Sequence, residues 1–281
     1  METGQGRLCH ALLLLILNCE KIYNQEEKQV IKAIMHGCNG KMGQVVSRLV
    51  GEDPSIEIVA GIDISDIVNN AYPVFKTLEE CNIPADVVID FSNASVIDKL
   101  LDTCTERKLP VVLCTTGLTN GQLQHVESAS KETAVLRSAN MSLGINLLMK
   151  LLKDAAKVLY PAGYDIEIVE KHHNQKLDAP SGTAIALADS INEELDRDCE
   201  YVYDRSGRRE KRRREEIGIS AVRGGTITGQ HNVIFAGEDE VIEFQHTAYS
   251  KAVFGKGAVE AAKFLAGKSA GLYQMSDVIQ L

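Results

Sequence analysis

The segment most informative about the fold is Gly37-Cys38-Asn39-Gly40-Lys41-Met42-Gly43. It lies between an apolar run at residues 30–35 and an amphipathic stretch at residues 41–50, which predicts a turn between a first strand and a first helix. Backbone N–H groups at a helix N-terminus can hold a pyrophosphate. The spacing is G-x-x-G-x-x-G and not the strict G-x-G-x-x-G, so the spelling alone fits a plain tight turn nearly as well. The prediction of a pyrophosphate site therefore rests on the position of the segment between a strand and a helix, and not on its glycine spacing.

A carboxylate supports the nucleotide prediction. Asp63 stands twenty residues beyond Gly43, at the end of a second expected strand over residues 56–62. An acidic side chain there can accept hydrogen bonds from the ribose of an adenosine. The glycine segment and Asp63 together favour a dinucleotide over an ordinary turn.

The chain from residue 30 onward alternates short apolar runs with amphipathic stretches, which is typical of β-α units in a parallel sheet. We expect a Rossmann-like nucleotide-binding domain of α/β class at residues 30–142 and 253–281. After a helical pattern at residues 142–159 the strands are separated by long loops. This change predicts a second, α+β domain with a mixed open sheet at residues 143–252, inserted before a final helix at residues 254–266 that packs on the first domain.

The composition excludes several classes of protein. Of 281 residues, 44% are hydrophobic and 25% charged, as in a soluble globular protein. Lys and Arg number 30 against 39 Asp and Glu, so the net charge of -9 makes nucleic acid an unexpected partner. The basic run at residues 205–214 is interpreted as a solvated loop. Seven Cys without a C-x-x-C pair favour a reducing cytoplasm and no zinc site.

Residues 1–29 form an extension. Its continuous apolar run, residues 11–17, is far shorter than the roughly 20 residues of a membrane-spanning helix, and its flanks suit a signal peptide poorly. Two readings stay open. Codons for residues 25–30 can contain a ribosome-binding sequence followed by a GTG start at Val30, which makes the extension a mis-called start. Alternatively, it is a disordered segment.

Two further loops follow expected strands at residues 110–114 and 134–137. The carboxyl ends of strands in an open α/β sheet bind ligands, so both loops are candidates for cofactor contacts, with ordinary turns as the alternative. Their residues are Cys114, Thr115, Thr116, Ser138, Ala139, Asn140 and Met141.

The densest polar segment runs from Glu167 to Ala184. It contains His172, His173 and Lys176, and Ser181-Gly182-Thr183 opens a helix whose free N–H groups can receive a carboxylate. A His can exchange a proton near neutral pH. The alternatives are surface histidines, metal ligands, and a simple ion pair between Lys176 and Asp178. The sequence does not orient the nearby Arg223-Gly224-Gly225 and His231.

The chain resembles the 4-hydroxy-tetrahydrodipicolinate reductase (dihydrodipicolinate reductase) family over roughly residues 30–281. The most specific match is Glu170-Lys171-His172-His173-Asn174-Gln175-Lys176-Leu177-Asp178-Ala179-Pro180-Ser181-Gly182-Thr183-Ala184, which is similar to the family's substrate loop nearly residue for residue. By this resemblance, His172 and Lys176 match the catalytic proton donors. His173, Gly182 and Thr183 match substrate contacts. The nucleotide contacts match Gly37, Cys38, Asn39, Gly40, Lys41, Met42, Asp63, Cys114, Thr115, Thr116, Ser138, Ala139, Asn140 and Met141.

The resemblance implies NAD(P)H-dependent reduction of a cyclic dicarboxylate in lysine and diaminopimelate biosynthesis, by a cytoplasmic homotetramer built through the second domain. Two departures from the family are Cys114, where many members carry Gly, and Ile64, where some place Arg for a 2′-phosphate. Because Asp63 would repel that phosphate and Ile64 offers no compensating charge, we expect NADH to be preferred over NADPH. Alternatives are a related two-domain dehydrogenase and a nucleotide-sensing protein without turnover.

Overall fold

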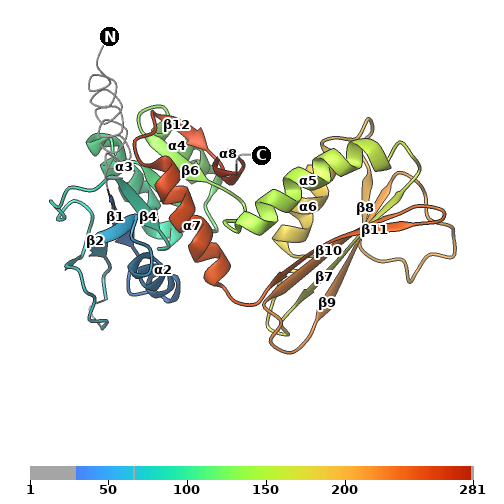
Figure 1. Ribbon diagram of the computed structural model, residues 1–281, viewed down its shortest axis with the longest axis horizontal. Helices are drawn as coiled ribbons and strands as arrows, with labels where there is room; N and C mark the ends of the chain where they lie inside the picture. Colours follow the sequence, from blue (N-terminus) through green and yellow to red (C-terminus); the bar gives the residue numbers. More distant parts are fainter. Residues whose placement is uncertain (1–29, 66, 280–281) are drawn as a thin grey trace, which may run out of the picture.

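The computed structural model describes residues 30–65 and 67–279, and it contains two β-sheets, each with its own helices (Figure 1). The interpretations of residues 1–29 therefore lie outside the described residues. Within the described part of the chain, no helix is both long and apolar enough to cross a bilayer.

The first sheet has seven strands in the order β12-β6-β5-β4-β1-β2-β3, and every neighbouring pair is parallel. The order reverses direction at β1, as in doubly wound folds, so the carboxyl ends of β1 and β4 form the expected ligand edge. The strands are β1 (Ile31–His36), β2 (Ile56–Ile62), β3 (Val74–Phe75), β4 (Val87–Asp90), β5 (Val111–Leu113), β6 (Ala134–Arg137) and β12 (Gly271–Tyr273).

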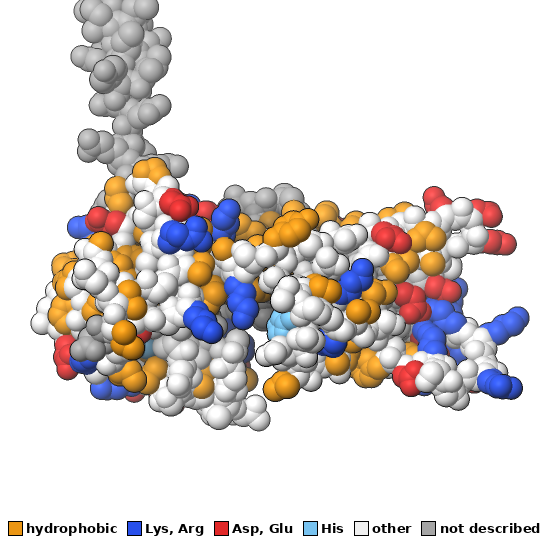
Figure 2. All heavy atoms as spheres, turned by 90° about the horizontal axis from the view of Figure 1, so that it is seen from below, with side chains coloured by type: hydrophobic (Ala, Val, Ile, Leu, Met, Phe, Trp, Pro, Cys, Tyr) orange, Lys and Arg blue, Asp and Glu red, His pale blue; other side chains and the backbone are white. Residues whose placement is uncertain are grey.

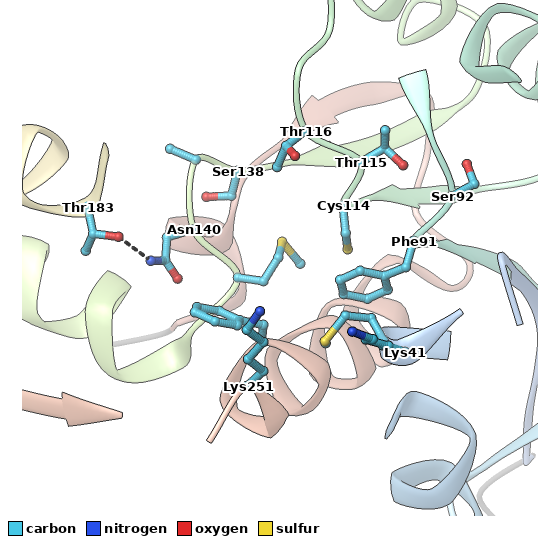
Figure 3. Close-up of a pocket in the computed structure, with 14 residues that line it drawn as sticks. Lys41, Phe91, Ser92, Cys114, Thr115, Thr116, Ser138, Asn140, Thr183 and Lys251 are labelled. Atoms are coloured by element: carbon cyan, nitrogen blue, oxygen red, sulfur yellow. Dashed lines mark hydrogen bonds between the residues drawn. The ribbon is translucent and has the colours of Figure 1, made fainter. Parts of the chain in front are cut away.

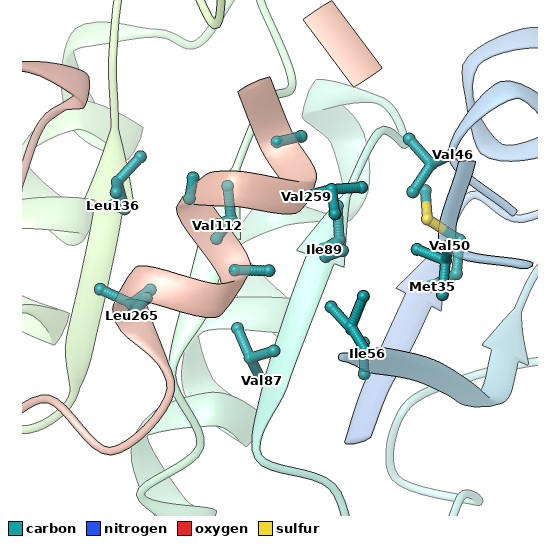
Figure 4. Close-up of a cluster of buried hydrophobic side chains, with 14 of the residues drawn as sticks. Met35, Val46, Val50, Ile56, Val87, Ile89, Val112, Leu136, Val259 and Leu265 are labelled. Atoms are coloured by element: carbon teal, nitrogen blue, oxygen red, sulfur yellow. The ribbon is translucent and has the colours of Figure 1, made fainter. Parts of the chain in front are cut away.

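Helices cover both faces of this sheet. On one face, α2 (Lys41–Gly51) and α7 (Ala252–Leu265) contribute Val46 and Val259 to a core that includes Ile89 of β4 (Figure 4). On the other face, α3 (Ile97–Arg107) and α4 (Asn120–Ala129) pack over a second core. The short η1 (Ala94–Val96) precedes α3, and α8 (Met275–Val278) lies near the chain end.

The second sheet has five strands in the order β11-β10-β7-β9-β8. It is mixed, because β7 is parallel to β9 but antiparallel to β10. Its strands are β7 (Asp165–His172), β8 (Glu200–Val202), β9 (Glu216–Arg223), β10 (Gly229–Ala236) and β11 (Val241–Ala248). Two helices, α5 (Leu143–Leu159) and α6 (Gly182–Asn192), cover one face (Figure 1). The two sheets confirm the predicted fold class.

The alternation of side chains along β7 positions two polar residues of the candidate site. Successive strand residues point to opposite faces, and β7 buries every second residue: Ile166, Ile168, Glu170 and His172. The first two join the core beneath α5 and α6. The strand therefore places Glu170 and His172, which are polar, on the helix-covered face.

Residues 205–214 form a loop whose residues are mostly exposed, as expected, but several of its arginines also form ion pairs with acidic residues of the sheet. Arg212 Nη1 lies 2.7 Å from Asp165 Oδ1, and Arg212 Nε lies 3.0 Å from Glu167 Oε1. Arg205 pairs with Glu167 and with the buried Glu216. Acidic and basic side chains accordingly gather at the end of the molecule that the five-stranded sheet forms (Figure 2). The basic run is thus tied to the sheet, and its charges are largely compensated.

Candidate active site

A cavity of about 670 Å³ lies at the carboxyl ends of strands of the first sheet (Figure 3). The predicted contacts of the two strand-end loops all line it, together with two from the glycine segment: Lys41, Met42, Cys114, Thr115, Thr116, Ser138, Ala139, Asn140 and Met141. Its size and its mixture of apolar walls with a few polar groups suit a small-molecule ligand.

The rest of the glycine segment forms the turn before α2 and does not line this cavity. Gly37 has φ +80, a conformation that L side chains rarely adopt. A Cβ on Gly43 would lie 2.7 Å from the Cα and the carbonyl carbon of Cys38, so the turn packs against the helix only because Gly43 has no side chain. Gly40 precedes the first residue of α2 as its N-cap.

Asp63 braces this turn. Its Oδ2 accepts a hydrogen bond from the backbone N–H of Asn39, and its Oδ1 accepts one from the N–H of Ser65, both at 2.9 Å. The next residue, Ile64, is 84% exposed. Lys76 Nζ donates a hydrogen bond to the Ile64 carbonyl at 2.9 Å, so the Lys76 ammonium lies beside the residue that follows Asp63.

Four cavity residues were not predicted from the sequence: Phe91, Ser92, Lys251 and Phe254. Phe91 and Ser92 directly follow β4, so the rule that selected the other strand-end loops also applies to them. Lys251 and Phe254 enter with α7 after the second sheet, and no local pattern marks them.

The buried Asp90 organises the strand ends below this cavity. Its Oδ2 accepts from Thr115 Oγ1 at 2.6 Å, and its Oδ1 accepts from Ser92 Oγ at 2.6 Å. His36 Nδ1 also contacts Oδ1, at 2.7 Å. Burial, assisted by Asp90, raises the pKa of the Cys114 thiol well above its usual value. Cys114 is therefore a neutral wall of the cavity.

A second cluster surrounds Glu170, which has no exposed surface. Its carboxylate contacts His172 Nδ1 at 2.6 Å, accepts from Ser181 N at 2.9 Å, and accepts from both terminal nitrogens of Arg223 at 2.7 Å. Burial acts to raise the pKa of Glu170, but the hydrogen bonds from Arg223, His172 and Ser181 outweigh it and hold the pKa below the usual value. The carboxylate is therefore ionised.

His231 packs edge-on against His172, with 5.2 Å between ring centroids. Its Nε2 lies 3.1 Å from Ser181 Oγ, the hydroxyl that also caps α6 by accepting from Ala184 N. Burial, followed by the nearby His172, lowers the pKa of His231 to about 4. His231 is therefore neutral near pH 7. Register pairs it with Glu170 across β7 and β10.

The remaining predicted residues lie in the loop from β7 to α6 and in the first turn of α6. Lys176 Nζ forms an ion pair with Asp178 Oδ1 at 2.8 Å, so the simple ion pair considered from the sequence is present. His173 is half-buried, and Gly182 begins α6. Thr183 Oγ1 accepts a hydrogen bond from Asn140 Nδ2 at 2.9 Å (Figure 3). That bond joins the loop after β6 to the first turn of α6, and Thr183 itself lines the cavity.

No cluster of three or more His, Cys, Asp or Glu side chains suited to a metal ion occurs among residues 30–65 and 67–279.

Family models match nearly all of the described chain. Residues 31–141 match "Dihydrodipicolinate reductase, N-terminus", and residues 144–279 match "Dihydrodipicolinate reductase, C-terminus". The 4-hydroxy-tetrahydrodipicolinate reductase of Caldanaerobacter subterraneus subsp. tengcongensis is 55% identical over 251 residues, which cover 89% of this chain and 99% of the relative. The protein of the same name from Clostridium tetani is 49% identical over 250 residues, covering 89% and 97%.

Solved structures of other proteins show the same fold. Dipicolinate-bound dihydrodipicolinate reductase from Paenisporosarcina sp. TG-14 aligns with a TM-score of 0.74 and 27% identity, covering 89% of this chain and 100% of that one. A probable dehydrogenase from Thermotoga maritima shares the fold, with a TM-score of 0.58 and 12% identity over 88% and 92% of the two chains.

Proposed function

The chain belongs to the dihydrodipicolinate reductase family, and from this premise we propose how its residues carry the family's reaction. It is an NAD(P)H-dependent oxidoreductase of lysine and diaminopimelate biosynthesis. It reduces 4-hydroxy-tetrahydrodipicolinate, by way of dihydrodipicolinate, to tetrahydrodipicolinate.

The nucleotide is proposed to bind across the turn at Gly37–Met42, Asp63, and the loops at Cys114–Thr116 and Ser138–Met141. The observation that carries this proposal is the hydrogen bond from Asn140 to Thr183, because it brings a wall of the cavity to the first turn of α6. A cofactor in the cavity and a substrate at α6 would then be neighbours. The residues present fit a dinucleotide, since a helix N-terminus faces the glycine turn.

When bound, the reduced nicotinamide supplies a hydride to the conjugated cyclic imine. The electron pair that this addition leaves on the ring must be taken up by a proton. His172 or Lys176 is proposed to donate it, since both hold exchangeable protons at the same loop. His173, Gly182 and Thr183 are proposed to bind the two carboxylates of the substrate, with the N–H groups of α6 as complementary donors.

We propose that NADH is preferred over NADPH. Asp63 favours a free 2′-hydroxyl, and Ile64 carries no charge to offset repulsion of a 2′-phosphate. Lys76, whose amino group reaches the Ile64 carbonyl, keeps this preference modest. Comparing kcat/KM for the two cofactors tests this, and equal values would contradict it.

Three coarser features of the protein are also proposed. The division into a nucleotide-binding domain (30–142 and 253–281) and a substrate domain (143–252) follows the two sheets. A homotetramer through the second sheet is supported by the face that α5 and α6 leave uncovered (Figure 1). Light scattering during size-exclusion chromatography tests the assembly. A cytoplasmic location is supported by the free thiols at the described cysteines.

The deciding experiment follows NADH oxidation with freshly generated 4-hydroxy-tetrahydrodipicolinate. His172→Ala and Lys176→Ala should lower kcat by about 100-fold or more, the range of general acid catalysis, while NADH still binds. Lys157→Ala is the matched control, because Lys157 also pairs with a carboxylate, Glu194, but lies on α5. A wild type that binds NADH without turnover would favour a nucleotide-sensing role. Full activity in both variants would refute the assigned roles.

A further inference from the structure

Glu170 accepts four hydrogen bonds, two on each oxygen. Oε2 faces His172 Nδ1 and Arg223 Nη1, and Oε1 faces Ser181 N and Arg223 Nη2. A fully buried carboxylate is costly unless it is paired and hydrogen-bonded. The fork of Arg223 supplies the opposite charge in bidentate geometry. Glu170 therefore remains an anion without contact to water.

An ionised carboxylate can only accept hydrogen bonds. The Nδ1 of His172, 2.6 Å from Glu170 Oε2, must therefore carry a proton whether the ring is neutral or charged. In the neutral ring the lone pair is then on Nε2. A Cβ added to Gly229 would lie 3.1 Å from that Nε2, so a side chain at this position would crowd the nitrogen and glycine leaves it room.

The same carboxylate holds the start of α6. Ser181 N donates to Glu170 Oε1, and the next two residues, Gly182 and Thr183, are the proposed substrate contacts. Arg223 Nη2 also donates to the Asp178 carbonyl, which ties the loop between Lys176 and Ser181 to the end of β9. The Glu170 carboxylate thus fixes the position of the His172 ring relative to Gly182 and Thr183.

We propose that Glu170 is a positioning residue of the reaction: through its contact with Nδ1 it keeps that nitrogen protonated, so that the charged His172 ring gives up its proton from Nε2 and returns to the neutral tautomer, and through Ser181 it aligns that ring with α6. This inference rests on the proposed role of His172. It adds Glu170 to the residues that serve the reaction, although Glu170 acts through His172 and Ser181 and not by touching substrate or cofactor.

Glu170→Gln tests the inference, because an amide of the same shape can turn a donor toward His172 Nδ1. We expect kcat to fall by about 100-fold or more, as general acid–base function is lost, with NADH affinity unchanged. Glu216→Gln is the matched control. Glu216 is also buried and Arg-paired in this sheet, but it lies at the opposite end of β9 from Arg223. It should retain the wild-type kcat.

Nitrogen-15 NMR of the imidazoles supplies a readout that a merely structural role would not move, with His172 assigned by comparison with His172→Ala. Neutral His172 should carry its proton on Nδ1 in the wild type and shift toward the Nε2-protonated form in Glu170→Gln. The wild-type measurement needs no variant, so it decides the tautomer even if Glu170→Gln does not fold.

Three results would overturn the inference: a neutral His172 protonated on Nε2 in the wild type, wild-type kcat in Glu170→Gln, or equal losses of kcat in Glu170→Gln and Glu216→Gln. Failure of the proposed function looks different. In that case His172→Ala itself retains turnover, whatever the tautomer of the ring.

Discussion

Acidification should destabilise this protein through His231. Burial lowers the pKa of this imidazole from 6.5 to about 4 in the folded chain, while the unfolded chain titrates near 6.5. Between these two values the unfolded chain binds a proton that the folded chain refuses, so the free energy of unfolding falls as the pH drops through this window. The part of the unfolding free energy that is sensitive to His231 is fully present above about pH 6.5. At about 1.4 kcal/mol per pH unit, the whole window corresponds to roughly 3 kcal/mol.

Urea denaturation at a series of pH values from about 7 to about 4 measures the effect. Other groups also titrate there, so the informative quantity is the difference between the wild type and His231→Gln, which retains an acceptor for Ser181 Oγ. That difference in unfolding free energy should change by about 3 kcal/mol across the window. If the two proteins lose stability in parallel as the pH falls, His231 is not held neutral by burial and the reasoning is refuted.

Gly43→Ala should weaken NADH binding by about tenfold or more, since a displaced turn costs about 1.4 kcal/mol of contacts or more. Gly51→Ala, in the same helix, has open space around its Cβ and should bind NADH normally. Fluorescence titration with NADH compares the two variants. Cys38, whose pKa burial raises to about 11, should react with iodoacetamide at pH 8 far more slowly in the folded protein than in urea, and equal rates by mass spectrometry would contradict this. Arg212→Ala should cost about 1–3 kcal/mol of unfolding free energy because it leaves Asp165 without its charged partner and Glu167 with Arg205 alone. The exposed Arg209, which has no ion pair among the described residues, should be replaceable by Ala without such a loss in urea unfolding.

The cavity could largely be located from the sequence, because parallel strands present their carboxyl ends at one edge and each loop there follows a recognisable apolar run. The polar segment at residues 167–184 was equally visible. The partners of Glu170 were not, since Arg223 is 53 residues away and reaches it only through the register of β7 with β9. Sequence alternation shows which face a side chain takes, but not which strand lies beside it.

Short elements were also missed, for a related reason. β3, β8 and β12 have two or three residues each, too few to show a period of two. They exist because a neighbouring strand offers free backbone groups, as β6 does to β12. The ion pairs of Arg205 and Arg212 likewise depend on where β7 and β9 end, which composition does not encode.

The return of α7 to the first sheet has a consequence for the order of events on the ribosome. Ala258, Val259, Ala262 and Leu265 belong to the same core as Met35 and Ile89, although the entire second sheet is synthesised between them. Domains generally fold as units, beginning with the N-terminal one, but here the first core lacks one wall until residue 265 has left the exit tunnel. The five-stranded half, complete by Ala248, is thus ready to fold while the half that began first still waits for α7.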